Sequence, residues 1–254
     1  MARIISVHSF RGGTGKSNIV ANVAALLAIG GCRVGVVDTD IQSPGIHVLF
    51  SKRGLELSKT LNDYLWGRST IAEAAYDVTP QTGTAANRTP GSIYLIPSSA
   101  RTSEITRVLR EGYDARNLVN GLRDLIDQIK LDVLMIDTHP GINEETLLSI
   151  AMSHTLLVVM RPDSQDYEGT GITVEVARQL EVPNLMLVVN KTPAALDRAE
   201  LQAQVEHTYG CPVAAVLPHS EELMTLGSSG LFVLRFPAHP ITVLYQQIAN
   251  RLMV

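Results

Sequence analysis

The glycine-rich turn near the start of the chain restricts the possible folds more than any other feature. An apolar run, Ile4 to Phe10, predicts a buried strand, and an Ala-rich apolar segment, Asn18 to Ile29, predicts a helix. The turn between them contains Gly12, Gly13, Thr14 and Gly15 and ends in Lys16-Ser17. A strand, a glycine turn, Lys-Ser and a helix in this order are the setting of a phosphate-binding loop. The alternative is a glycine turn that merely links a strand to a helix.

Each residue type in this turn has a physical use in binding phosphate. Glycines let backbone N–H groups approach an anion without a Cβ in the way, and the helix start adds free N–H donors and the positive end of its dipole. We expect Lys16 to reach the β- and γ-phosphates and the Ser17 hydroxyl to ligate Mg²⁺. The strict motif has four residues between its first Gly and the Gly-Lys pair, and here Phe10 stands in place of that Gly. The predicted nucleotide-binding residues of the loop are Gly12, Gly13, Thr14, Gly15, Lys16, Ser17 and Asn18.

The loop FRGGTGKS, from Phe10 to Ser17, resembles the deviant Walker A box of the ParA/MinD family of partitioning and positioning ATPases, McdA-like proteins among them. The pattern of that family is KGGxGK followed by Ser or Thr, and its first Lys crosses a dimer interface to the nucleotide of the partner subunit. Here that position is Arg11, whose permanently charged guanidinium could serve a phosphate in trans as an arginine finger does. A local contact within the loop is the alternative for Arg11. The resemblance implies a homodimer that ATP closes and hydrolysis opens.

Two further apolar runs end in acidic residues. Arg33 to Asp38 is followed by Asp40, and Val133 to Asp137 is followed by Thr-His-Pro-Gly. Acidic residues at the carboxyl ends of parallel strands face the ligand crevice of a doubly wound sheet. The resemblance implies that Asp40 orients the attacking water, that Asp38 acts through Mg²⁺ and its waters, and that Asp137 holds Mg²⁺ through a water. The alternative for Asp38 and Asp40 is that both cap the next segment.

His139 replaces a Pro of the family pattern DTPPG, which the stretch Asp137 to Gly141 otherwise resembles. A role in lining the site and a structural role are both open for this residue.

The later strands carry the features that the resemblance assigns to base recognition and to the dimer face. The predicted strand Leu185 to Val189 is followed by Asn190-Lys191, and the predicted strand Val213 to Leu217 by Pro218-His219. Both pairs resemble adenine-side loops, with Asn190 bonding the base edge. Thr-Pro rather than a carboxylate follows Asn-Lys, which favours ATP over GTP. After the strand Thr155 to Met160, the resemblance places Asp163 and Asp166 where they could meet a cation from the partner.

The middle of the chain gives weaker predictions. The segments 47–50 and 61–66 have helix-spaced apolar residues, Trp66 is interpreted as a packing residue, Thr79 to Ser92 is interpreted as an exposed loop, and Ile93 to Pro97 as a strand. Residues 101–130 predict a helical region with six basic and five acidic side chains. That pattern indicates either a solvated surface laced with salt bridges or part of a DNA-binding surface, and we favour the first.

Composition excludes several classes of protein. The 254 residues have a net charge of −4, which gives no global basic field for nucleic acid, and the two widely separated cysteines, Cys32 and Cys211, form neither a disulfide framework nor a metal-binding pair. No apolar run is long enough to span a bilayer, and the N-terminus lacks a signal core, so we expect a cytoplasmic protein with the nucleoid as a candidate location.

The tail, Pro240 to Val254, predicts a helix packed on the sheet. Its single basic residue, Arg251, is too little charge for a membrane anchor.

These patterns predict a three-layer α/β fold with a mostly parallel twisted sheet, in one P-loop ATPase domain over residues 1–254. The expected cofactors are ATP and Mg²⁺, and the expected catalytic residues are Lys16, Asp40 and Arg11. The leading hypothesis is a MgATP-dependent dimerising switch that positions or partitions a cargo, such as a plasmid or chromosome, a carboxysome-like body or a surface organelle. It would act through ATP-dependent nonspecific DNA binding, with an adaptor protein that stimulates hydrolysis. The alternatives are a metalloenzyme-maturation ATPase, whose relatives carry paired cysteines that this chain lacks, and a MinD-like membrane-associated division regulator, which the tail argues against.

Overall fold

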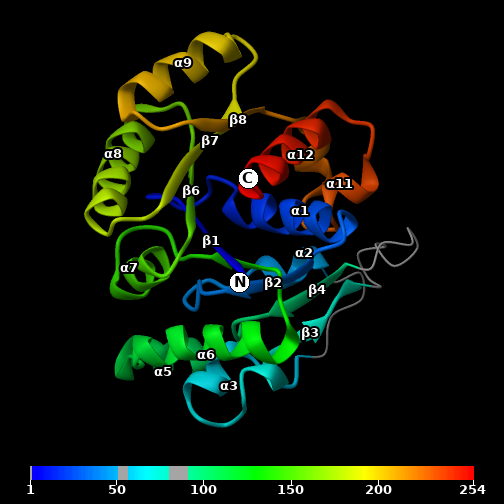
Figure 1. Cartoon of the computed structure of the whole chain (residues 1–254), viewed down its shortest axis with the longest axis vertical. Helices are drawn as coiled ribbons and strands as arrows, with labels where there is room; N and C mark the ends of the chain where they lie inside the picture. The colour runs from blue at the N-terminus through cyan, green and yellow to red at the C-terminus, as the bar shows by residue number, and fades with distance from the viewer. Residues whose placement is uncertain (1, 51–56, 80–90) are drawn as a thin grey trace.

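One twisted sheet of eight strands forms the centre of the molecule (Figure 1). A computed structural model of the chain describes residues 2–50, 57–79 and 91–254. The strand order across the sheet is β3-β4-β2-β5-β1-β6-β7-β8, and every neighbouring pair is parallel except β3 with β4. The strands are β1 (Arg3–His8), β2 (Arg33–Asp38), β3 (Tyr76–Asp77), β4 (Ser92–Ile96), β5 (Val133–Asp137), β6 (Thr155–Met160), β7 (Asn184–Thr192) and β8 (Val213–Pro218).

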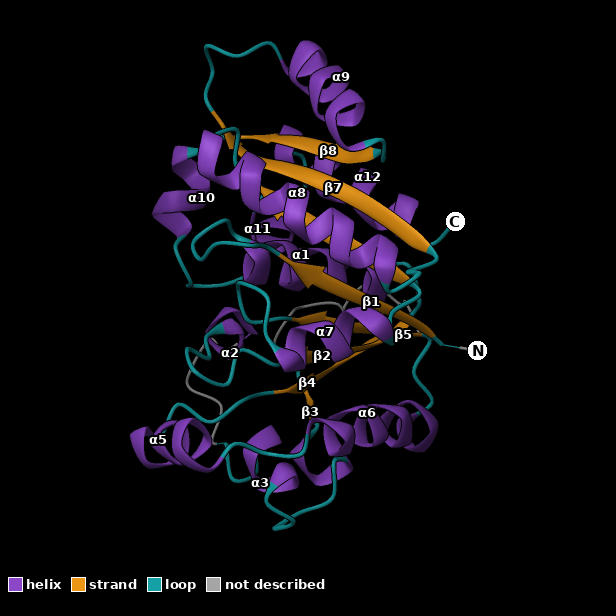
Figure 2. Ribbon diagram, turned by 90° about the vertical axis from the view of Figure 1, so that its left-hand side faces the viewer, coloured by secondary structure: helices purple, strands orange, loops and turns teal. Residues whose placement is uncertain are grey.

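Helices cover both faces of this sheet, which confirms the predicted three-layer α/β fold. Figures 1 and 2 show α1, α11 and α12 on one face and α7 and α8 on the other, with α3, α5 and α6 gathered below the half of the sheet that contains β2 and β4. The helices are α1 (Lys16–Ile29), α2 (Ile46–Phe50), α3 (Leu61–Leu65), the 3₁₀ turn η1 (Ala72–Ala74), α5 (Thr102–Glu111), α6 (Ala115–Ile129), α7 (Glu144–Ala151), α8 (Ser164–Gln179), α9 (Arg198–Tyr209), α10 (Glu221–Leu226), α11 (Phe232–Arg235) and α12 (Pro240–Leu252).

The alternation of side chains along each strand explains the two packed layers. On β1, Ile5 and Val7 belong to the core beneath α1 and α12, whereas Ile4 faces the core beneath α3 and α6. On β6, Leu157 and Val159 join the first core, and the residues between them pack under α8. Because both faces of the strands are covered, the strands are apolar throughout rather than alternating, as parallel sheets require.

The structure differs from the sequence prediction at a few boundaries. The predicted helical region 101–130 consists of two helices, α5 and α6, because the chain turns at Gly112, whose φ of 65° favours glycine. Strand β4 begins at Ser92, one residue before the predicted start, and residues 80–90 of the predicted loop before it lie outside the described residues. The strand β3 was not predicted because its two residues are too few to show a periodic pattern. Helix α1 begins at Lys16, two residues before the predicted start.

The strand order brings the predicted site residues to one edge of the sheet. Strand β5 lies between β1 and β2, so the carboxyl ends of all three strands are adjacent. Asp38 and Asp137 are register partners at the ends of β2 and β5, and the glycine turn leaves β1 beside them. The doubly wound topology therefore produces a crevice where three loops meet.

Candidate functional site

The glycine turn between β1 and α1 borders a cavity of about 370 Å³. Gly13 and Gly15 have φ values of 77° and 97°, a region that residues with a side chain rarely adopt. A Cβ on Gly15 would lie 2.5 Å from Nδ2 of Asn190, whereas nothing lies within 4 Å of such a position on Gly13. The loop backbone thus approaches its neighbours on one side and remains open on the other. The cavity is lined by Gly12, Gly13, Gly15, Lys16, Ser17, Asn18, Asp40, Ser43, Pro140, Asn190, Lys191 and Leu223.

Lys16 presents a buried positive charge to this cavity. Lys16 is 7% exposed, and its Nζ donates to Oγ of Ser9 at 3.1 Å. Burial lowers the pKa of Lys16, and the nearby carboxylates of Asp137, Asp40 and Asp38 oppose that shift. An ammonium group held in this way is stabilised further by any anion that enters the cavity, which is the chemistry of a phosphate-binding lysine.

The two aspartates at the strand ends are fully buried and differ in their hydrogen bonds. Asp38 accepts from the backbone amides of Asp40 and Gly45, both at 3.1 Å. Asp137 has an Oδ1 atom that is buried and has no hydrogen-bond partner among the described residues. Burial raises the pKa of Asp137 to about 6, against the opposing effects of the Ser17 hydroxyl and Lys16, and burial together with Asp137 and Asp40 raises the pKa of Asp38.

An unpaired carboxylate oxygen beside a serine hydroxyl fits a hard divalent cation. Mg²⁺ binds oxygen ligands and keeps several of its waters, so it needs few protein ligands. Ser17 lines the cavity and its hydroxyl contacts the buried Asp137, so the two offer such oxygens side by side, and the unsatisfied Oδ1 atom is the observation that supports this fit. A buried acceptor without a donor costs free energy, which a cation would recover.

The two loops at this edge of the sheet meet at Asp40 and His139. Oδ1 of Asp40 accepts from the amide and hydroxyl of Ser43 at 3.1 and 3.0 Å. Nδ1 of His139 lies 3.7 Å from the same oxygen. The structure therefore places His139 against the residue to which the resemblance assigns water activation.

Asn190 and Lys191 hold the glycine turn from the opposite side. Nδ2 of Asn190 donates to the carbonyl of Thr14 at 2.7 Å, and its Oδ1 accepts from the amide of Lys191 at 2.9 Å. Nζ of Lys191 donates to the carbonyl of Gly13 at 2.8 Å, and its backbone has a φ of 56°. Nδ2 of Asn190 and Nζ of Lys191 thus bind the loop that would hold the phosphates, and base recognition by Asn190 stays a prediction.

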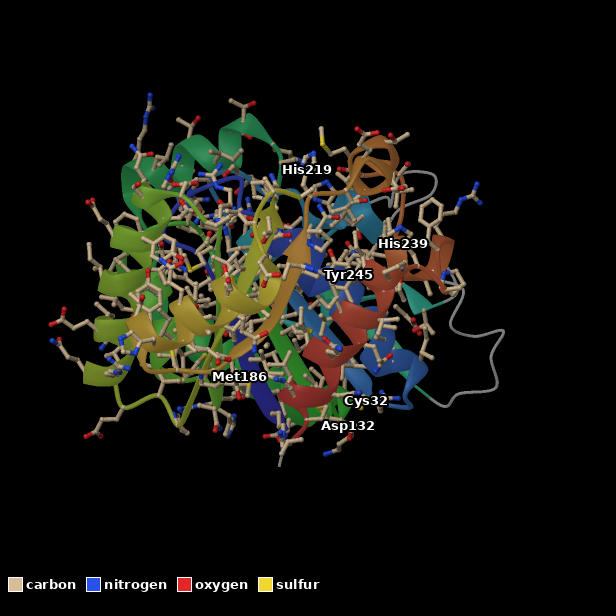
Figure 3. The ribbon with its side chains drawn as sticks, turned by 90° about the horizontal axis from the view of Figure 1, so that it is seen from above. Cys32, Asp132, Met186, His219, His239 and Tyr245 are labelled. Carbon is tan, nitrogen blue, oxygen red and sulfur yellow. The ribbon has the colours of Figure 1, made fainter. Side chains whose placement is uncertain are left out.

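The predicted second adenine-side loop lies next to this pair. The amide of His219 donates to the carbonyl of Thr192 at 2.9 Å, which joins the end of β8 to the end of β7. The His219 side chain is exposed near the carboxyl edge of the sheet (Figure 3), and Pro218 is half-buried. Neither residue lines the cavity as the described residues define it.

Arg11 forms ion pairs within its own chain. Its NH1 atom lies 3.1 Å from Oδ1 of Asp163 and 3.2 Å from Oδ1 of Asp166. Arg161 also contacts both carboxylates and makes three hydrogen bonds to Asp166, from its amide at 2.8 Å, Nε at 3.1 Å and NH2 at 3.4 Å. The cation that sequence analysis expected from a partner at Asp163 and Asp166 is thus, in this structure, supplied by two arginines of the same chain.

Three residues of this neighbourhood were missed by sequence analysis. His8 is fully buried, and its Nδ1 lies 2.8 Å from Oγ1 of Thr138. Burial, with Lys16 and His139 nearby, lowers the pKa of His8 to about 3, which keeps the ring neutral. The Phe10 ring packs where a Cβ on Gly169 of α8 would otherwise lie. A polar residue in an apolar strand was the available signal for His8, and two carboxylates within five residues were the signal for Arg161. Gly169 gave none, since the Phe10 ring that it meets is distant in sequence.

Comparison with known proteins agrees with this geometry. Residues 1–253 match the ParA family, described as the NUBPL iron-transfer P-loop NTPase. The chain is 26% identical over 254 residues to an uncharacterised ATP-binding protein of Methanocaldococcus jannaschii, covering 100% of this chain and 88% of that protein. It is 24% identical to the septum site-determining protein MinD of Thermotoga maritima, over 99% of this chain and 88% of that protein. Its fold is similar to that of MinD from Pyrococcus horikoshii complexed with Mg-ADP, with a TM-score of 0.80 and 21% identity over 99% of this chain and 96% of that one.

Proposed function

Because the chain belongs to the ParA family of P-loop NTPases and is an ATP hydrolase of that family, we propose that it is a MgATP-dependent switch that dimerises with ATP and positions a cellular cargo. The relatives with MinD names are site-determining proteins, which supports the positioning role.

The nucleotide site is assigned to the cavity at the glycine turn. The amides of residues 12–17 and the Lys16 ammonium stabilise the phosphate charge, and Asp40 orients the attacking water. Ser17, Asp137 and, through waters, Asp38 would hold Mg²⁺, which supplies charge neutralisation at the phosphates. Asn190 and Lys191 act on the loop itself, since they fix the carbonyls of Thr14 and Gly13. Pro218 and His219 remain the proposed border of the base.

The observation that carries the dimer proposal is the unequal attachment of two arginines to Asp166. Arg11 contacts this carboxylate through one nitrogen, and its side chain is 36% exposed. Arg161 contacts it through three donors. If Arg11 leaves, the buried carboxylate keeps a bidentate partner, so its release does not strand an unpaired charge. Arg11 is therefore free to move to the phosphates of a second subunit, the role of the signature Lys in this family.

A binding surface for DNA is proposed on the basis of the helices α5 and α6, although part of their charge is used within the chain. Arg107 stacks over the Trp66 ring at 3.9 Å and pairs with Glu111, and Arg116 pairs with Asp114. Any DNA binding would thus depend on two subunits that combine the remaining cations. Within the described residues, no helix combines the length and hydrophobicity needed to cross a bilayer.

The description of the matching family favours a second candidate, the transfer of iron or iron–sulfur clusters. Thiolates are the preferred ligands of such clusters. Cys32 precedes β2 and Cys211 precedes β8, so both lie at the edge of the sheet opposite the nucleotide cavity, and Figure 3 shows Cys32 and His219 at opposite ends of the molecule. Among residues 2–50, 57–79 and 91–254, no group of three His, Cys, Asp or Glu side chains is arranged to hold a metal. We therefore place this candidate second.

The test uses the Asp40→Ala protein with ATP or ADP. Light scattering after gel filtration should show a dimer with ATP and a monomer with ADP, and Arg11→Ala in the same background should prevent the dimer. Binding to nonspecific DNA should require ATP and weaken steeply with salt. A monomer at saturating ATP would contradict the dimer, and a dimer without DNA affinity would redirect the search for the surface to membranes and proteins.

A further inference from the structure

His139 and Asp40 face each other across the two loops that follow β5 and β2. Nδ1 of His139 lies 3.7 Å from Oδ1 of Asp40, and the side chains are 21% and 17% exposed. A hydrogen bond between nitrogen and oxygen has a length of about 2.7–3.2 Å, and a water between them would require roughly twice that separation. The gap is thus too wide for a hydrogen bond and too narrow for a bridging water. A movement of less than about 1 Å would close it.

The Nδ1 atom of His139 is an unsatisfied hydrogen-bonding group. It is buried and has no hydrogen-bond partner among the described residues. A buried polar nitrogen without a partner costs on the order of 1–3 kcal/mol, and Asp40 offers the acceptor that faces it. A hydrogen bond between this nitrogen and Asp40 would therefore remove that cost.

The backbone on both sides of His139 is fixed, so the ring is presented in one direction. Oγ1 of Thr138 donates to the carbonyl of Val7 at 3.1 Å, and Oγ1 of Thr146 donates to the carbonyl of His139 at 3.4 Å. The amide of Gly141 donates to the carbonyl of Ser9 at 3.1 Å. These bonds connect the loop to β1, to α7 and to the start of the glycine turn.

Among the residues that the structure describes, the hydrogen bonds to the Asp40 side chain come from its own loop. The amide and hydroxyl of Ser43 bind its Oδ1 atom, and both residues belong to the same short loop. A carboxylate on a loop keeps a productive orientation only if a second element fixes it, and a misplacement of 1 Å in a reacting group can cost about 10²-fold in rate. His139 approaches the same Oδ1 atom from another element, the loop after β5.

We propose that His139 is a positioning residue for ATP hydrolysis, which donates a hydrogen bond to Oδ1 of Asp40 and so turns Oδ2 toward the attacking water. This inference rests on the proposed function. His139 itself is not among the residues that line the cavity in the described part of the chain, whereas its neighbour Pro140 is. It therefore acts through Asp40 and not on the nucleotide.

The experiment measures kcat and KM for ATP of the full chain with Mg²⁺ for the wild type and a set of single and double variants. His139→Ala should lower kcat about 10- to 100-fold with KM changed less than about twofold, because it removes orientation and leaves nucleotide binding intact. His139→Asn, whose amide can occupy the place of Nδ1, should recover most of the rate. In an Asp40→Asn background, His139→Ala should lower the single-turnover rate less than about twofold further, since two residues that act as one unit are not additive. The controls are Lys16→Ala and His207→Ala, the latter on the exposed face of α9.

Each result decides between this inference and the alternatives. An unchanged kcat in His139→Ala, a raised KM at unchanged kcat, or a full additional loss in the Asp40→Asn background would overturn the positioning role. If His139→Ala does not fold, the same comparison uses His139→Asn alone and combined with Asp40→Asn. A loss of kcat in His139→Asn as large as the loss expected for His139→Ala, about 10- to 100-fold, would then overturn the role. The proposed function is tested separately by Lys16→Ala. It would fail if the wild-type chain hydrolysed ATP no faster than the Lys16→Ala variant.

Discussion

The contact between Phe10 and Gly169 allows the coupling between the glycine turn and α8 to be measured. A Cβ on Gly169 would overlap Cγ and Cδ1 of the Phe10 ring and lie 2.7 Å from its Cβ. Gly171, two residues further along the same helix, would meet only Cε1 of Tyr209 at 3.9 Å, an ordinary contact. The main difference between the two glycines is thus the Phe10 ring, which a Cβ would overlap at Gly169 only.

This difference sets the expected magnitudes. Replacing Gly by Ala inside a helix stabilises it by about 1 kcal/mol, so Gly171→Ala should raise the free energy of unfolding by up to about that amount. Gly169→Ala carries the same gain and a packing clash, and overpacking typically costs about 1–3 kcal/mol. Because the helix propensity cancels, the difference between the two variants isolates the clash, which we expect to be about 1–3 kcal/mol in favour of Gly171→Ala.

The assay is equilibrium urea unfolding of both variants, followed by circular dichroism, with ATP affinity measured by titration. In a domain of this size, 1 kcal/mol corresponds to about 2–4 °C in Tm, so thermal scans give an independent check. Gly169→Ala should also weaken ATP binding, because the ring that it displaces belongs to the residue beside Arg11. A second substitution, Phe10→Ala, should remove most of the penalty of Gly169→Ala, with a coupling energy of at least about 1 kcal/mol. Equal stabilities of the two glycine variants would refute the reasoning.

Three other predictions concern the attachments of the same loop. Arg161→Ala should cost about 3 kcal/mol in unfolding free energy and Arg11→Ala about 1 or less, since only the first removes the two guanidinium donors, Nε and NH2, from the buried Asp166, while the backbone amide at position 161 is kept; equal losses in urea unfolding would contradict this ranking. Burial lowers the pKa of His8 to about 3 in the folded state, so the stability that the neutral ring contributes is present above pH 6.5 and is lost as pH falls toward 3. Tm should therefore fall less between pH 7 and 5 in His8→Asn than in wild type, and equal falls of Tm in the two proteins would contradict this prediction. Asn190→Ala frees a loop carbonyl and should raise the Kd for ATP at least about tenfold, while an unchanged Kd by calorimetry would show that the bond is dispensable.

The sequence predicted the sheet well because parallel strands buried on both faces are continuous apolar runs. Three predicted strands, Arg33 to Asp38, Val133 to Asp137 and Thr155 to Met160, agree with β2, β5 and β6 at both ends. In β2 and β5 the run stops at an aspartate that belongs to the crevice, so the chemistry that ends the strand also marks the site. The carboxyl-end rule then predicted that Asp38 and Asp137 would lie together, and their register shows that they do.

Other features of the site depend on contacts that no local pattern encodes. The partners of Arg11 lie 152 and 155 positions away in sequence, and those of Asn190 and Lys191 lie 176 and 178 positions away. Such pairs become neighbours only once β1, β6 and β7 are aligned in the sheet. The sequence could suggest that Asn190 is polar and near the site, but the choice between a base edge and a backbone carbonyl depends on a distance of a few ångströms. The roles assigned to the site residues stay predictions that the variants above can test.

Phe10, which departs from the strict motif, and Arg11, which departs from the family pattern, are both matched by features of α8. Phe10 stands where the strict motif has Gly, and α8 has Gly169, without a side chain, in front of it. Arg11 stands where the family has Lys, and Asp163 and Asp166 at the start of α8 accept it. The Phe10 ring packed against Gly169, and the Arg11 guanidinium between two carboxylates, attach the loop to α8 more firmly than Gly and Lys at these two positions would. The loop after β2 is joined to the end of β5 by the amide and hydroxyl of Thr39, which donate to the carbonyl of Asp137, but further along the two loops His139 approaches Asp40 without a hydrogen bond. Nucleotide-dependent rearrangement should therefore begin at that approach, where a movement of less than about 1 Å makes or breaks a hydrogen bond, and reach α8 only when Arg11 leaves its carboxylates.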